Sequence, residues 1–184
     1  MRLLLGISGA SGAPFAVDFL KRCPADEKYV ILTRWGRSLL KTEADLSPED
    51  LAPFANKIYA NDDLSAPFAS GSNPFDALVI LPCSASTMSK IACGIGDTLL
   101  TRMAAVALKE RRKLIIALRE TPLSAIHLEQ ALRLSLAGAI VMPLSPPFYQ
   151  KPQTIEEMIG HFNDKILSLI GHPTALAWKP ELLE

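Results

Sequence analysis

Short, almost continuous apolar runs alternate with longer amphipathic stretches along this chain, and this alternation constrains the fold more than any other feature. The runs are rich in Leu, Ile and Val, which is typical of strands in a parallel sheet covered on both faces. They cover Arg2–Gly6, Tyr29–Thr33, Ala77–Leu81, Lys113–Leu118 and Ala139–Met142. The stretches between and after them predict helices over Ala13–Arg22, Arg34–Thr42, Ser84–Ala92, Thr98–Glu110, Pro122–Leu136 and Ile155–Ile170. This order indicates an α/β protein with an open, doubly wound parallel sheet.

Two of the predicted helices have recognisable first turns. Thr121 is a suitable N-cap with Pro122 at the first helical position, and Thr154-Ile-Glu-Glu157 has the pattern of a capping box. The Pro- and Ser-rich stretch from Ser65 to Pro74 is expected to form a long loop near the functional site. No repeat or linker divides the sequence, so residues 1–184 are expected to form one domain.

Composition excludes several classes of function. The 184 residues include 19 basic and 19 acidic side chains, so nothing indicates nucleic acid or an acidic surface as a partner. A chain without net charge also favours self-association. The three cysteines, Cys23, Cys83 and Cys93, lack CxxC spacing, which predicts a reducing compartment without disulfides or a thiolate metal site.

The apolar start of the chain raises the question of a targeting segment. Ser8 and Ser11 interrupt it within a few residues, and Asp18 follows, so we expect no signal peptide. No apolar run approaches the roughly 18 residues of a membrane span. We therefore expect a cytoplasmic protein that has no membrane partner.

Small and hydroxyl-bearing residues follow three of the predicted strands. The first strand leads into Gly6-x-x-Gly9-x-x-Gly12, the second into Thr33, and the third into a segment with four hydroxyl side chains, Ser84–Ser89. Ligands of doubly wound folds bind at this carboxyl edge of the sheet. Hydroxyls at helix starts suit a phosphate or the edge of an aromatic ring bound by backbone N–H groups. For the first loop alone, the alternative is an ordinary tight turn.

Charged residues mark a second candidate region. Arg119 and Glu120 directly follow the apolar run LIIAL, so the pair lies at the carboxyl end of a buried strand. Charges there are costly to desolvate unless they are paired or used, which favours a functional role. Arg102 and Lys109 are seven residues apart and therefore share one face of a predicted helix. The presence of basic residues at the end of this helix is also explained by their favourable interaction with the helix dipole.

Other chemistries have weaker support. A dinucleotide-binding enzyme needs an acidic residue about 20 positions after the glycines, where this chain has Thr33-Arg34, although Arg34 also suits a 2′-phosphate. No tyrosine is followed four residues later by lysine, so a nicotinamide-dependent reductase is a minor alternative. The three histidines have no metal-ligand spacing. Cys83 is interpreted as a buried hydrophobic residue rather than a nucleophile.

Five segments carry a resemblance to a known family, in the same order along nearly the whole chain. They are GISGASGA, SGS, LPCSASTMSKIACGIGDTLLTRMAAVALKERRKLIIALRETPLSAIHLE, GAIVMP and FYQKPQ. In these segments the chain resembles the UbiX-type flavin prenyltransferases. The resemblance implies a flavodoxin-like, Rossmann-type fold and a homo-oligomer, often a dodecamer, with active sites between subunits. It also implies transfer of a dimethylallyl group from dimethylallyl monophosphate to N5 and C6 of reduced FMN, without a metal, and a UbiD-type decarboxylase as recipient of the prenylated FMN.

The resemblance also assigns roles to individual residues. It implies an FMN site formed by Gly9, Ala10, Ser11, Thr33, Ser84, Ala85, Ser86, Thr87, Arg102 and Arg119. It implies a substrate-phosphate site formed by Arg119, Glu120, Tyr149, Lys165 and Lys109 of a neighbouring subunit. Catalytic roles fall to Ser11, Glu43, Lys109 and Glu120, with Glu43 assisting proton removal, and Trp178 is expected near the mouth of the site.

The chain departs from the family pattern at a few positions. Thr33 stands where many relatives have Ser, which keeps the hydroxyl. Lys165 stands where some relatives have Arg, and it keeps the charge but loses the bidentate fork. The segment DLSAPFASGS lacks a tryptophan that some relatives carry, so part of the apolar lining differs.

Two rival functions come from different classes. Flavin-dependent cysteine decarboxylases share the S-x-x-T-x-x-K and D-x-L-L-T patterns, but they also have a histidine soon after the second strand and a P-x-M-N-x-x-M segment. This chain has LTRWGRSLL and LRETPLS there, which favours prenyl transfer. A non-catalytic FMN carrier predicts tight flavin binding without conversion. The presence of Glu43, Lys109, Glu120 and Tyr149 argues against it.

Overall fold

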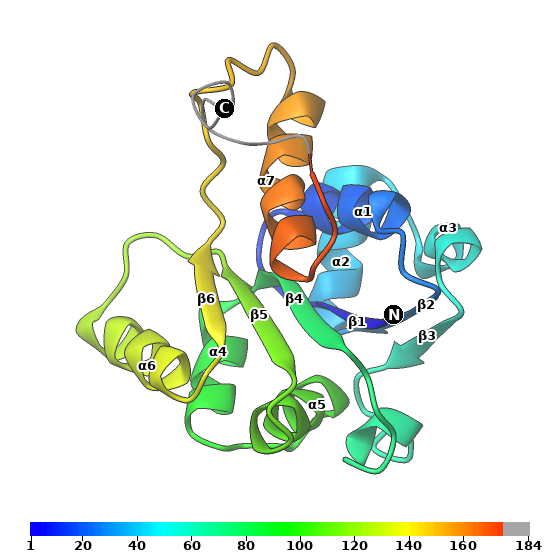
Figure 1. The fold of residues 1–184 in the computed structure, drawn as a ribbon, viewed down its shortest axis with the longest axis vertical. Coiled ribbons are helices and arrows are strands. Elements are labelled where there is room, and N and C mark those ends of the chain that lie inside the picture. Colours follow the sequence, from blue (N-terminus) through cyan, green and yellow to red (C-terminus); the bar gives the residue numbers. More distant parts are fainter. Residues whose placement is uncertain (175–184) are drawn as a thin grey trace.

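A sheet of six parallel strands forms the centre of the protein, in the order β3-β2-β1-β4-β5-β6 (Figure 1). The computed structural model describes residues 1–174. The strands are β1 (Arg2–Ile7), β2 (Glu27–Leu32), β3 (Lys57–Ala60), β4 (Ala77–Cys83), β5 (Lys113–Leu118) and β6 (Ile140–Pro143). The helices are α1 (Ala13–Arg22), α2 (Arg34–Ala44), α3 (Pro48–Leu51), α4 (Ala85–Ala92), α5 (Leu99–Lys109), α6 (Ala125–Leu136) and α7 (Ile155–Leu169). The predicted doubly wound α/β architecture is confirmed.

Helices cover both faces of the sheet, as the apolar runs predict. Helices α1, α2 and α7 lie on one face, and α4, α5 and α6 lie on the other (Figure 1). Alternate residues of β1 belong to two different hydrophobic clusters. Leu3, Leu5 and Ile7 lie in one cluster, and Leu4 lies in the other. Because both sides of each central strand are buried, these strands need apolar residues at nearly every position.

Strand β3 is missing from the sequence-based prediction. Its four residues, KIYA, include one buried side chain and pair only with β2, so it is an edge strand without a continuous apolar run. Its existence depends on pairing with β2 rather than on a local pattern.

The predicted start of α6 at Pro122 is wrong. The helix begins at Ala125, and Ser124 is its N-cap, with the Ser124 hydroxyl accepting a hydrogen bond from the His127 N–H at 3.3 Å. Ser is as good a cap as Thr, and the later one is used here. The predicted Thr154 cap of α7 is correct, although the Glu157 carboxylate accepts from the Gln153 N–H at 2.6 Å rather than from Thr154.

The stretch from Ser65 to Pro74 contains a 3-10 turn and does not lie near the carboxyl edge of its own sheet. Arg112, which directly precedes β5, donates to the carbonyl oxygens of Gly71 at 2.6 Å and Asn73 at 3.0 Å. Within one chain, this loop therefore lies at the amino edge of the sheet, away from the carboxyl edge.

The strand order leaves a crevice between the carboxyl ends of β1 and β4. The chain leaves β1 toward β2 on one side, and β4 continues toward β5 on the other, so the loops after β1 and β4 separate. Ser8 links these loops: its buried hydroxyl donates to the Pro82 carbonyl at 2.9 Å and accepts from the Ser84 N–H at 2.8 Å. Within residues 1–174, no helix has the length and apolar character needed to cross a membrane.

Candidate active site

A cavity of about 210 Å³ opens at the crevice between β1 and β4. The amino ends of α2 and α4 meet there, because these helices follow β2 and β4, the two strands that flank β1 in the sheet. The hydroxyls of Thr33 and Ser84 cap these helices by accepting from the N–H groups of Gly36 and Thr87. The lining residues are Gly9, Thr33, Trp35, Asn61, Ser84, Ser86, Thr87, Lys90, Thr98, Leu100 and Thr101. Five of the residues predicted to bind FMN thus line one cavity.

The first glycine-rich loop does not present its helix terminus to this cavity. The Glu43 carboxylate accepts from the N–H groups of Gly12 at 2.7 Å and Ala13 at 2.9 Å, at the start of α1. An anion from the protein itself therefore occupies the position that a phosphate takes in other glycine-rich loops. Ala10 and Ser11 lie in the same loop between the Glu43 contact and Gly9.

Glu43 is held as a carboxylate. Partial burial by itself raises the pKa of Glu43, but the Gly12 N–H, the Ser11 hydroxyl, the Ala13 N–H and the charge of Arg119 together bring that pKa below its ordinary value. A carboxylate bonded in this way orders the loop that carries Ser11. It is also a weaker base than an isolated glutamate.

The lowered pKa of Glu43 predicts an acid-dependent contribution to stability. Since the pKa is lower in the folded chain, the contribution is present above the ordinary value of 4.5 and is lost as the pH falls through the folded value. We expect the free energy of unfolding of the wild type to fall more steeply below about pH 4.5 than that of Glu43→Gln. Urea titrations at pH 7, 5 and 4 measure this; parallel curves for the two proteins would contradict it.

Two further cavities lie along the same edge of the sheet, beside the charged pair that follows β5. Arg119 and Glu120 line a cavity of about 250 Å³, and Tyr149 and Lys165 line one of about 240 Å³. The two cavities are neighbours because Pro143 and Ser145, at the end of β6, line both of them. The structure therefore brings together four of the five residues predicted to hold the substrate phosphate.

Lys109 is the fifth, and it lies at the other end of the sheet. It is the last residue of α5, where it forms an ion pair with Glu110. Its Nζ atom lies 2.8 Å from where a Cβ on Gly71 would be, beside the loop at the amino edge. Glu120 follows the opposite end of β5, and six strand residues span about 20 Å. Lys109 therefore does not belong to the same site as Glu120 within one chain.

One further predicted residue lies outside these cavities. Arg102 is exposed on α5, with its guanidinium beside Gly96 in the loop between α4 and α5. Trp178 lies outside the described residues.

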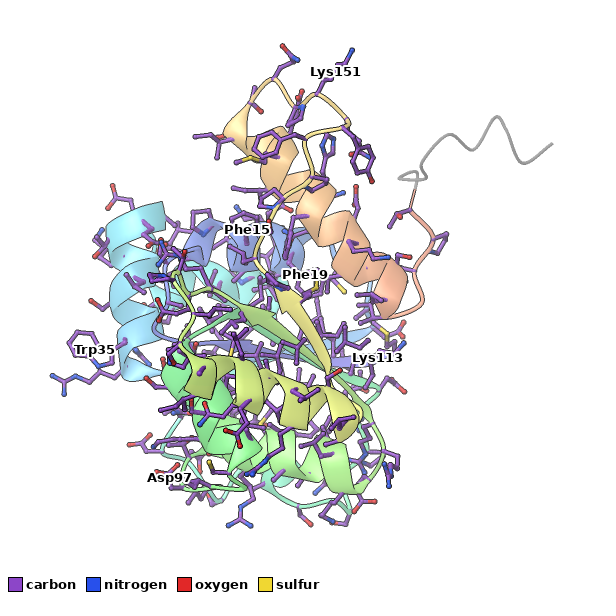
Figure 2. All side chains as sticks on the ribbon, turned by 90° about the vertical axis from the view of Figure 1, so that its left-hand side faces the viewer. Phe15, Phe19, Trp35, Asp97, Lys113 and Lys151 are labelled. Atoms are coloured by element: carbon purple, nitrogen blue, oxygen red, sulfur yellow. The ribbon has the colours of Figure 1, made fainter. Side chains whose placement is uncertain are left out.

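Sequence inspection missed Trp35 and Lys90 as lining residues of the first cavity. Trp35 projects from the start of α2 at the same side of the molecule as Asp97, opposite Lys113 at the start of β5 (Figure 2). The spacing of Lys90, four residues after Ser86 on α4, was the available signal, since residues four apart share a helix face.

The cysteine that ends β4 is buried, as expected from the sequence. Cys83 has no exposed surface, and burial raises the pKa of its thiol above the ordinary value, so it is a protonated, inert side chain. In the part of the chain that the structure describes, no three His, Cys, Asp or Glu side chains form a group able to hold a metal ion.

Comparisons with known proteins agree with this geometry. The family model described as Flavoprotein matches residues 1–170. The flavin prenyltransferase UbiX of Thermoplasma acidophilum is 47% identical over 171 residues, which cover 93% of this chain and 95% of that protein. The chain belongs to the UbiX-type flavin prenyltransferases.

Solved structures of UbiX-type proteins superpose closely. A dodecameric FMN-dependent UbiX-like decarboxylase from Escherichia coli O157:H7 has a TM-score of 0.93 and 36% identity, with 97% of this chain and all of that chain covered. AnUbiX in complex with FMN and dimethylallyl pyrophosphate has a TM-score of 0.91 and 34% identity, with 97% and 98% covered. The fold and the family inferred from the sequence are confirmed.

The residues at the first cavity fit the phosphate of FMN. Two helix amino ends meet there, and hydroxyls of Thr33, Ser86 and Thr87 lie beside them. Backbone N–H groups at helix starts and small hydroxyls are the usual ligands of a phosphate ester. No acidic side chain is among the residues that line this cavity.

Proposed function

We propose that the protein is a flavin prenyltransferase that transfers a dimethylallyl group from dimethylallyl monophosphate to N5 and C6 of reduced FMN. The observation that carries this proposal is a pair of anion-binding clusters on one edge of the sheet. Hydroxyls and helix amino ends form the first, and Arg119, Glu120, Tyr149 and Lys165 surround the second. A reaction between two phosphorylated molecules needs two such clusters. The product serves a UbiD-type decarboxylase.

The residues of the second cluster assist departure of the substrate phosphate. When bound, reduced FMN supplies the nucleophilic atoms, and the allylic C–O bond breaks as inorganic phosphate leaves. Arg119 and Lys165 stabilise the negative charge that develops on the leaving group. Glu120 and Tyr149 are placed to donate a proton to it. Apolar residues such as Met142, Pro147 and Phe162 line the neighbouring cavity and limit water there.

Ser11 and Glu43 serve the later proton transfer. Ser11 lies in the loop after β1, and its hydroxyl hydrogen-bonds Glu43. We assign the pair to removal of the C6 proton, with Ser11 between the flavin and the Glu43 carboxylate. The hydrogen bonds from Gly12 and Ala13 keep that carboxylate in one position throughout.

Anaerobic incubation with reduced FMN and dimethylallyl monophosphate tests the function. We expect mass spectrometry of the extracted flavin to show a five-carbon adduct. An FMN-loaded preparation that gives no adduct would contradict the proposal and leave the carrier hypothesis. A parallel incubation with dimethylallyl pyrophosphate measures the preference between the two donors. Oxidation of a C-terminal cysteine peptide would instead favour the cysteine decarboxylase alternative.

We also propose that residues 1–184 act as one domain in a cytoplasmic homo-oligomer, such as a dodecamer. Helix α6 supports self-association because it has apolar residues on both faces. Leu134 is buried against the body, whereas Leu128, Leu132 and Leu136 are 56%, 59% and 80% exposed along the opposite face. A helix with apolar residues on two opposite faces is normally covered on both of them. The outer stripe therefore suits contact with a second copy.

Substitution in this stripe is expected to reduce the size of the assembly. Leu132→Glu places a charge in the middle of the proposed contact, while Ile155→Glu alters an equally exposed residue at the first turn of α7. Light scattering after size-exclusion chromatography should show a smaller particle for Leu132→Glu and the wild-type mass for Ile155→Glu. Circular dichroism checks that both variants are folded. A wild-type mass for both would exclude α6 from the assembly contacts.

A further inference from the structure

Lys90 is the charged side chain at the first cavity, and no role follows for it from the family resemblance. It lies on α4, one helical turn after Ser86, and the two side chains line the cavity together with Thr87. The other residues that line this cavity are uncharged. A cation on the same helix face as the hydroxyls is therefore directed toward the space that they surround.

Asp97 fixes the position of Lys90. The Lys90 Nζ atom lies 2.7 Å from the Asp97 carboxylate, and the Thr101 hydroxyl lies 3.4 Å from the same carboxylate. The hydrogen bond from Lys90 is the main reason that the pKa of Asp97 lies below its ordinary value, so Asp97 is a carboxylate at neutral pH. Asp97 does not line the first cavity, so it holds the lysine from outside.

A formal cation would strengthen phosphate binding in this cavity beyond what its helix amino ends and hydroxyls supply. A phosphate monoester carries a charge of about −1.5 to −2 at neutral pH. Helix amino ends and hydroxyls supply partial charges only, and the nearby start of α1 is already taken by Glu43. Arg119 lines a different cavity, next to the proposed substrate phosphate.

We propose that Lys90 is the cationic ligand of the FMN phosphate and that Asp97 is its positioning residue. The inference rests on the proposed function only in taking FMN as the bound flavin. An exposed ion pair such as Lys90–Asp97 contributes little to stability. If the lysine had only a structural role, its removal would therefore hardly change the free energy of unfolding.

Comparison of two flavins tests the proposal without measuring prenyl transfer. FMN and riboflavin differ only in the phosphate, so a phosphate ligand affects FMN alone. We expect Lys90→Met to weaken FMN binding about 10- to 100-fold and to change riboflavin binding less than about twofold. Lys90→Arg should restore most of the FMN affinity. Fluorescence titration of the oligomeric protein measures the dissociation constants.

A matched control removes a lysine elsewhere. Lys41 on α2 pairs with Asp45, just after that helix, at the same distance of 2.7 Å, and Lys41→Met should leave the affinity for both flavins unchanged. Equal weakening of FMN and riboflavin by Lys90→Met, or no weakening of either, would overturn the proposal. Neither result bears on the prenyl-transfer assay. If that assay gives no adduct, the comparison of FMN with riboflavin can still be interpreted.

Discussion

A mixture of two inactive variants, Lys109→Met and Glu120→Gln, is expected to regain about one quarter of the wild-type activity when the chains assemble together. Each variant alone should lose activity by about 100-fold or more, because each lacks one group that acts on the leaving phosphate. Lys109 ends α5 at the amino edge of the sheet, whereas Glu120 follows β5 at the carboxyl edge. The proposed site therefore takes them from different chains. Random assembly of equal amounts places an intact Glu120 beside an intact Lys109 in about one site of four.

The control for this experiment uses two residues of the same edge. Arg119→Met and Glu120→Gln alter neighbours that line one cavity of one chain, so their mixture should stay inactive. Chains with different affinity tags show whether mixed assemblies have formed. Mixed assemblies of Lys109→Met and Glu120→Gln without activity would contradict a shared site.

Gly36→Ala is expected to destabilise the fold by about 3 kcal/mol or more, against the usual effect of this substitution in a helix. Alanine is favoured over glycine by about 1 kcal/mol in a helix interior. Gly36 is in the first turn of α2, where a Cβ atom would overlap the carbonyl oxygen of Ile7 and lie 2.9 Å from its carbon. Both atoms belong to the backbone of β1, so neither side can move without disturbing the sheet.

Gly160→Ala provides the matched comparison. Gly160 is in α7, where a Cβ atom would meet only the end of the Arg22 side chain, at 3.2 Å. We expect its stability to be unchanged or raised by up to about 1 kcal/mol. Urea denaturation of both variants at one protein concentration, followed by circular dichroism, measures the difference. Similar midpoints for the two variants would contradict the close contact between α2 and β1.

The strongest sequence patterns predicted the fold well. Runs such as LIIAL in β5 are apolar at nearly every position because both faces are covered, and this physical requirement is visible without a structure. Weak elements were missed for the converse reason. Strand β3 has one neighbour and a mixed pattern, and the start of α6 depends on a choice between Thr121 and Ser124 that local chemistry does not decide.

The candidate site was predicted by residue type and not by arrangement. Hydroxyls at Thr33 and Ser84–Thr87 follow strands whose carboxyl ends share an edge, so their meeting follows from the fold class. Which helix start is occupied by a side chain of the protein does not follow from the fold class. Glu43 is 31 residues from Gly12, and only the packing of α2 beside α1 shows that it occupies the first loop.

The sequence alone determined the parallel sheet, the edge that carries the site, and the family, because each depends on local pattern or residue identity. The tertiary structure decided which of these groups act together. In the structure, Lys109 and Glu120 lie about the length of a strand apart, and the Glu43 carboxylate occupies the start of α1. Lys90 lines the cavity at the crevice between β1 and β4. Such relations depend on contacts between residues distant in the chain, where small differences in packing distance determine whether two groups meet.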